Sequence, residues 1–168
     1  MPNRGPLKVV DTLQGTSFLA IEAALKTLQR REPNLARRSF TVLRHGESTV
    51  VVLSGDGTPL AARVSPDAEL SEREVERLAE APEKPKVLDR IQGSSLPAIR
   101  AGVDAFAKRL PDPAPYRITL MSEGDSLVVA FTDGSAPAGG RGAPGARPGF
   151  EVELDARDLS VRRSGFIR

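Results

Sequence analysis

The chain has 168 residues, of which 39% are hydrophobic and 27% are charged, and its formal net charge is +2. This composition indicates a globular protein rather than a disordered chain, and the near balance of charge argues against a nucleic-acid partner. Cysteine is absent, which excludes disulfides, thiolate metal sites and cysteine nucleophiles. No stretch has the length of a membrane span and residues 1–6 lack the apolar core of a signal peptide, so we expect a cytoplasmic protein without membrane contact.

One sequence element occurs twice. Leu13-Gln14-Gly15-Thr16-Ser17-Phe18 is echoed by Ile91-Gln92-Gly93-Ser94-Ser95-Leu96, and the same offset aligns the residues that follow each copy. A gapless match with a period of roughly 80 residues is too long for a solenoid repeat and predicts a duplicated supersecondary unit. We therefore divide the chain into residues 1–84, a first repeat with a linker helix, and residues 85–168, a second repeat.

The first repeat is predicted to be a helix followed by three strands. Its short apolar patch at residues 7–10 either pairs as an edge strand or lies loose. From Ser17 the apolar residues recur at helical spacing up to Arg30 and Arg31, which, with Pro33, are typical of a helix end. The β-branched runs at 38–44 and 49–53 flank a glycine turn and predict an antiparallel hairpin, and 60–64 predicts a third strand.

Residues 65–90 are predicted to link the repeats. Ser71 and Glu74 fit a capping box, and Leu70, Val75 and Leu78 form one apolar stripe, so we expect a short helix there. Pro82 and Pro85 end that helix and stiffen the approach to the second repeat.

The second repeat follows the same plan. Its helix stripe runs from Leu96 to Leu110, and its hairpin strands are predicted at 116–121 and 127–132. Residues 134–149 are rich in glycine, proline and arginine without apolar periodicity and are expected to form a mobile loop. A strand pair at 150–155 and 159–163 is predicted to close the chain.

The strands at 50–53 and 127–131 are apolar on both faces. A strand of this kind needs cover on each face, and the helix of its own repeat covers only one. We expect the second cover to be the other repeat, a second copy of the chain or a partner protein. The faces assigned to this contact are led by Leu43, Val51 and Leu53 and by Met121, Val129 and Phe131.

Familiar catalytic signatures are scarce. His45 is the only histidine, it lies in a predicted turn, and its counterpart in the second repeat is Glu123. Residues 139–142 lack the Lys-Ser/Thr pair of a phosphate-binding loop, and the acidic residues between 67 and 80 do not have calcium-loop spacing, so we predict no cofactor and no metal. The repeated Gln-Gly-Thr/Ser-Ser element is interpreted as a turn with a helix cap, with a ligand contact as the alternative.

The predicted order of a helix and a curled antiparallel meander resembles cystatin-like and NTF2-like folds and the PepSY-type repeat. Residues 150–155 with Val161 are similar to the closing hairpin of PepSY-type and NTF2-like immunity domains, although Leu159 stands where those families commonly have a turn glycine. We therefore expect an α+β fold of two αβββ units related by pseudo-two-fold symmetry, each a helix packed on an antiparallel sheet. The resemblance implies a noncatalytic binding or inhibitory module, often bacterial.

The functional hypothesis is a protein-binding module of the immunity or inhibitor type, with an acidic protein as partner and a homodimer as a further option. Its predicted contacts are Arg141, Arg147, Arg162, Arg163 and Arg168. The alternative is an NTF2-like small-molecule-binding protein or enzyme in which a buried carboxylate acts as acid or base. The candidates for that carboxylate are Asp125, Glu151, Glu153 and Asp155.

Overall fold

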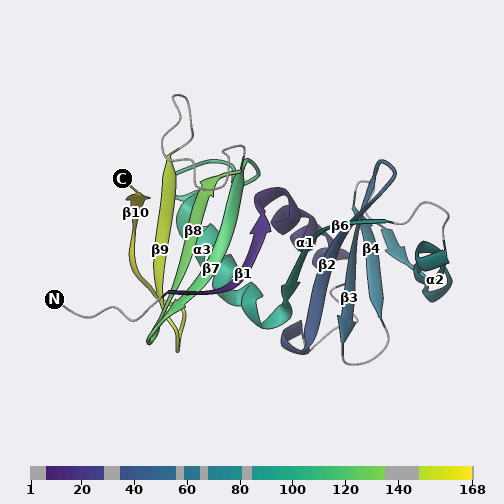
Figure 1. The fold of residues 1–168 in the computed structure, drawn as a ribbon, viewed down its shortest axis with the longest axis horizontal. Coiled ribbons are helices and arrows are strands. Elements are labelled where there is room, and N and C mark those ends of the chain that lie inside the picture. The colour runs from purple at the N-terminus through teal and green to yellow at the C-terminus, as the bar shows by residue number, and fades with distance from the viewer. Residues whose placement is uncertain are drawn as a thin grey trace. The chain divides into compact units, whose positions relative to one another are not determined.

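The computed structural model describes residues 7–28, 35–55, 59–64, 68–80, 85–134 and 148–167 (Figure 1). The chain divides into two compact units, one made of residues 1–16 with 95–168 and the other of residues 17–94. Each unit contains a five-stranded antiparallel sheet, so the predicted α+β class is confirmed. In the described part of the chain no helix is both long and apolar enough to cross a membrane.

The unit of residues 17–94 has the strand order β5-β4-β3-β2-β6. Its elements are α1 (Gly15–Leu28), η1 (Leu35–Arg37), β2 (Arg38–His45), β3 (Ser48–Gly55), β4 (Leu60–Val64), β5 (Ala68–Leu70), α2 (Glu72–Glu80) and β6 (Lys86–Gln92). The other unit has the order β1-β7-β8-β9-β10, seen in Figure 1 as the strands from purple to yellow. Its elements are β1 (Lys8–Gln14), η2 (Gly93–Ser95), α3 (Leu96–Ala107), β7 (Tyr116–Glu123), β8 (Ser126–Asp133), β9 (Gly149–Asp155) and β10 (Val161–Ile167).

The two sheets exchange their first strands. β1, from the first repeat, pairs with β7, and β6, from the second, pairs with β2. β1 ends at Gln14 and α1 begins at Gly15, so no loop residue allows the helix to fold back onto the sheet that holds β1. The predicted domains, residues 1–84 and 85–168, place β1 in the first and β6 in the second. In the structure β1 belongs to the unit with residues 95–168, and β6 belongs to the unit of residues 17–94.

Part of the predicted linker is sheet. Residues 65–90 contain β5 and β6, which the sequence reasoning missed, as well as the predicted helix α2. The capping box is confirmed, because the Ser71 Oγ accepts from the Glu74 backbone N–H while the Glu74 Oε1 accepts from the Ser71 backbone N–H. The apolar patch that precedes the first helix lies in an edge strand, β1, one of the two alternatives left open.

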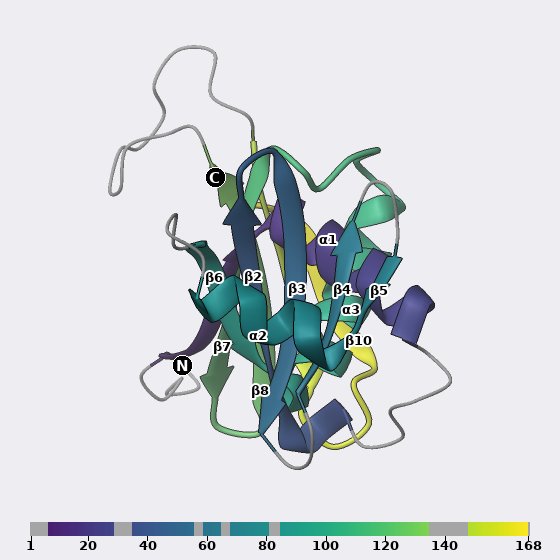
Figure 2. The same cartoon turned by 90° about the vertical axis from the view of Figure 1, so that its right-hand side faces the viewer.

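We call the sheet of residues 17–94 the first sheet and the other the second sheet. Both faces of the first sheet are covered by helices of the same unit. Figure 2 shows α2 in front of the strands and α1 behind them. The α2 side contains Val50, Ala61 and Leu70, with Leu43, Val52, Val75 and Leu78 packed against them. The second cover of this sheet is therefore α2, which our prediction did not consider. The predicted grouping of Leu43 with Val51 and Leu53 was also wrong, because Leu43 pairs with Val50, and Val51 pairs with Val42 on the opposite face.

In the second sheet the core lies between α3 and one face of the strands. Phe106 of α3 stacks on Phe131 with ring centroids 4.3 Å apart and meets Tyr116 and Phe150 edge to face at 5.1 and 5.7 Å. Phe106, Phe131 and Phe150 are fully buried. We had predicted that Met121 shares this face with Val129 and Phe131. That prediction was wrong, because Met121 pairs with Val128 and lies on the opposite face.

Candidate functional site

The face of the second sheet that points away from α3 is the candidate site, and we call it the open face. The strand register places on it apolar residues in the middle and charged residues toward β9 and β10. Its apolar members are Val9, Met121, Val128, Ala130 and, at the β10 edge, Ile167. Its carboxylates are Glu123, Glu151, Glu153 and Asp155, and its guanidinium groups come from Arg117, Arg162 and Arg163. Among the described residues of this unit, α3 is the one helix packed on the sheet, and it lies on the other face.

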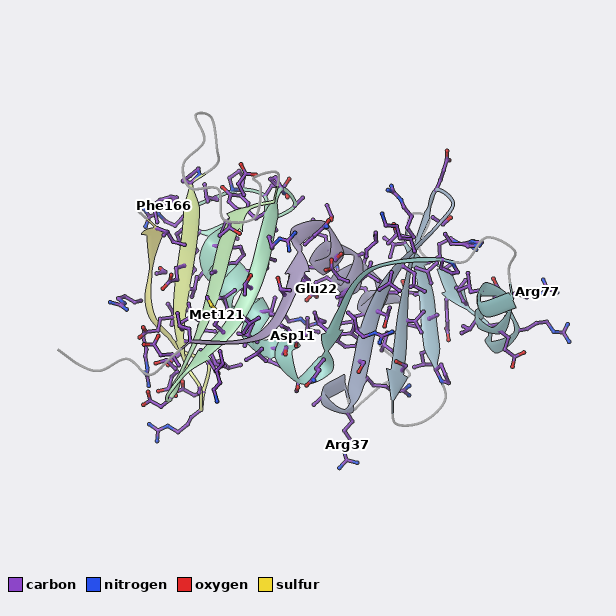
Figure 3. All side chains as sticks on the ribbon, in the orientation of Figure 1. Asp11, Glu22, Arg37, Arg77, Met121 and Phe166 are labelled. Atoms are coloured by element: carbon purple, nitrogen blue, oxygen red, sulfur yellow. The ribbon has the colours of Figure 1, made fainter. Side chains whose placement is uncertain are left out.

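Exposure differs across the open face. Val128 and Ala130, on the central strand, are 2% and 7% exposed, because side chains of the flanking strands close over them. Val9, on edge strand β1, is 65% exposed. It is paired with Met121 of β7, a partly buried residue that is labelled in Figure 3. Val9 and Met121 therefore form a small apolar edge beside a shielded apolar centre.

Two of the predicted contact residues are held in ion pairs of the closing hairpin. The Nη2 of Arg162 donates to the Asp155 Oδ2 at 2.7 Å, and its Nη1 donates to the Ser126 Oγ at 2.6 Å. Arg163 Nη2 lies 3.0 Å from the Glu153 Oε1. Both guanidinium groups are therefore already paired with carboxylates of this chain, which makes them less suited to bind an acidic partner. The other predicted contacts, Arg141, Arg147 and Arg168, and all but the ends of the predicted loop 134–149 lie outside the described residues.

Hydrogen bonds in the closing hairpin lower the pKa of two of its aspartates. The hydrogen bond from Arg162, helped by the Arg157 backbone N–H, lowers the pKa of Asp155 below its usual value, and Asp155 in turn raises the pKa of Arg162. The backbone N–H and hydroxyl of Ser160 lower the pKa of Asp158. An ionised Asp155 does not act as a general acid at neutral pH, which weakens the buried-carboxylate alternative at that residue.

Leu159 is the one described non-glycine residue with a positive φ, at 61°. This is the position where the resembling families commonly have glycine, and the left-handed conformation explains why glycine suits it. The turn is held by the Leu159 backbone N–H, which donates to the Asp155 carbonyl at 2.8 Å. The backbone of this turn thus has the conformation that glycine favours, although the residue is leucine.

We expect Asp155→Asn to destabilise the protein in a pH-dependent way. Because the folded-state pKa of Asp155 is lowered, its contribution is fully present above the unfolded pKa of about 3.9 and is lost as the pH falls through the lower folded value. Thermal melts of wild type and variant should therefore differ at pH 7, and the difference should begin to shrink below about pH 4. Asp104→Asn, at an exposed residue of α3, is the control and should leave the melting temperature unchanged. A difference between wild type and Asp155→Asn that stays constant down to pH 3 would contradict this linkage.

The repeated Gln-Gly-Thr/Ser-Ser element has a structural role that the cap interpretation missed. The hydroxyl of Ser95, at the start of α3, makes no cap hydrogen bond and instead donates to Asp11 of β1. The hydroxyl of Ser17, in the first turn of α1, likewise donates to Asp89 of β6. Both serines are buried. Each copy of the element therefore tethers a helix to the strand that came from the other repeat.

The remaining sequence candidates form no catalytic cluster. His45 ends β2, and in the described ranges no three residues of the His, Cys, Asp and Glu types gather as a metal site would require. Exposed Val9 and the open face as a whole were missed in the sequence. The signal was present, because Lys8-Val9 and Asp11 recur as Lys86-Val87 and Asp89, which extends the repeat upstream into a strand.

Comparison with protein families, curated proteins and solved structures gave no match to this chain.

Proposed function

We propose that the protein is a noncatalytic protein-binding module that binds its partner through the open face. The supporting observation is the unequal covering of the two sheets: α2 packs on the outer face of the first, whereas the described residues of the other unit place no helix on the corresponding face. The apolar edge at Val9 and Met121 then gives a partner surface to bury. An immunity or inhibitor protein acts in this way, by occupying a surface of its target.

The fold details of the hypothesis belong to the same proposal. The equal strand orders, with a pre-helix strand at one edge followed by four strands of a meander, support a duplicated, pseudo-two-fold, cystatin-like origin of the two units. The ion pairs of Asp155 and Glu153 support a noncatalytic role, because paired carboxylates are poor general acids. The contact surface proposed now is centred on Val9 and Met121 rather than on the arginines, since Arg162 and Arg163 are engaged within the chain.

Val9→Lys is expected to abolish partner binding without unfolding the protein. Val9 is exposed, so lysine is tolerated in the strand, but its charge prevents an apolar contact from forming. Affinity purification of the full chain from its native cells should recover a stoichiometric partner with wild type and lose it with Val9→Lys. Val87→Lys is the matched control, since Val87 occupies the corresponding place in β6 and is 52% exposed. Absence of any stoichiometric partner, together with turnover of a small molecule in a metabolite screen, would favour the enzyme alternative.

A further inference from the structure

The first unit contains a face that corresponds to the open face rung by rung. Its central residues Leu43, Val50 and Val52 have as counterparts Met121, Val128 and Ala130. The edge strands correspond as well, because Val87 pairs with Leu43 as Val9 pairs with Met121. In the first unit this face is covered by a helix, α2, which contacts β4 and β5 and packs Val75 and Leu78 on the sheet. The chain itself therefore contains one sheet face, with matching residues on its β2 and β3 strands, that is covered by an amphipathic helix with a narrow apolar stripe.

The charged side chains on the α2 side of the first sheet and on the open face differ in sign. Beside Val50 and Val52, β4 presents Arg63 and Ala61. Beside their counterparts Val128 and Ala130, β9 presents Glu153 and Glu151. On the α2 side of the first sheet the described strands contribute two arginines, Arg63 and Arg90, and no carboxylate. The helix that covers this basic face is acidic, since Glu72–Glu80 contains four glutamates and two arginines.

The open face is acidic, so its charge favours a basic helix. Its carboxylates outnumber its guanidinium groups, and two of its three arginines are held by Asp155 and Glu153. The Glu151 carboxylate makes no ion pair or hydrogen bond with the rest of the described chain, and the residues that pair with Glu151 across the strands are the small Ala130 and Gly165. Small neighbours leave the Glu151 carboxylate within reach of a cation on a segment that lies over the sheet.

We propose that the open face binds an amphipathic helix of a partner protein, with an apolar stripe flanked by lysine or arginine. This inference rests on the proposed function and specifies the partner. The apolar stripe would pack on Met121 and on the side chains that close over Val128 and Ala130, and a basic flank would meet Glu151. The α2 helix of a second copy does not fit, because its stripe already packs on its own sheet and its flanks are acidic.

The test uses two synthetic helical peptides and the full chain. Both peptides repeat the Val75 and Leu78 spacing of α2 over about 18 residues. A staple on the outer side holds them helical, since isolated helices of this length are only marginally stable in water. One has lysines flanking the stripe and the other has glutamates. Fluorescence anisotropy should show that the lysine peptide binds about fivefold or more tightly than the glutamate peptide, a difference that salt reduces.

Substitution at Glu151 then locates the binding. Glu151→Lys should weaken binding of the lysine peptide about fivefold and strengthen that of the glutamate peptide, and Glu151→Gln should give a smaller change in the same directions. Glu76→Lys, at an exposed glutamate of α2, is the charge-matched control and should change neither. Equal binding of the two peptides, no binding of either, or insensitivity to both Glu151 variants would overturn the inference. If the peptides fail while a native partner is still lost with Val9→Lys, the helix chemistry is rejected and the binding function stands.

Discussion

Residues 17–94 expressed alone are expected to fold as a stable monomer, whereas residues 1–84, a fragment of similar length, are not. The first fragment contains the whole strand order β5-β4-β3-β2-β6 together with α2 and all of α1 except its first two residues. The second contains β1, whose partner strand β7 is missing, and lacks β6. Without β6 the inner strand β2, which contains the fully buried Phe40, becomes an unpaired edge, and Ser17 loses its hydrogen bond to Asp89.

Light scattering after gel filtration and thermal melts monitored by circular dichroism separate the two outcomes. Residues 17–94 should be monomeric with one cooperative transition. Residues 1–84 should give no folded monomer, and any ordered species should be a dimer in which β1 of one copy takes the place of β6 in the other. A folded monomer of residues 1–84 would show that the strand exchange is not required for stability.

Alanine at Gly15 is expected to be among the most damaging single substitutions in the chain. A Cβ at Gly15 would lie 1.9 Å from the Pro113 carbonyl oxygen, and backbone atoms cannot rotate away from it. The strand-to-helix junction or the segment at 113–114 would have to move, which we expect to cost more than about 4 kcal/mol. In a chain of this size the melting temperature should fall by roughly 10 °C or more.

Alanine substitutions at two further glycines should be less destabilising and serve as comparisons for Gly15→Ala. At Gly102 of α3 a Cβ would meet the Val129 side chain at 2.6 Å, so Gly102→Ala should cost about 1–3 kcal/mol, partly offset by the better helix propensity of alanine. At Gly165 of β10 nothing lies within 4 Å, so Gly165→Ala should be nearly neutral. Denaturant unfolding of all three variants should rank them Gly15, Gly102, Gly165 from the most to the least destabilised. A neutral Gly15→Ala would contradict the close packing at the junction.

Local features of the fold were predictable from the sequence. The hairpins were found because β-branched runs flank Gly46 and Gly124, which adopt positive φ values of 63° and 58° in the turns. The helix α2 was found because Ser71 and Glu74 form a capping box. β6 was missed, since residues 86–92 mix charged and apolar residues after two prolines and were taken as the end of a linker.

Pairing between distant segments was not predictable in the same way. Thr12 of β1 bonds Ile118 of β7 across 106 residues, and nothing in the local pattern of either strand names the other. The open face depends on that pairing, because the register between β1 and β7 decides that Val9 stands beside Met121. A one-residue shift between β1 and β7 would have placed a different β1 side chain beside Met121.

The most direct test of binding at the open face is site-specific photo-crosslinking in the native cells. A photoreactive phenylalanine derivative in place of Met121 would sit in the middle of the proposed contact. The same group in place of Arg77, which points away from the sheet on α2 (Figure 3), serves as the control. We predict one discrete adduct of the full chain with a partner protein from position 121 and none from position 77. Adducts from both positions alike, or from neither, would contradict the assignment of the open face as the binding surface.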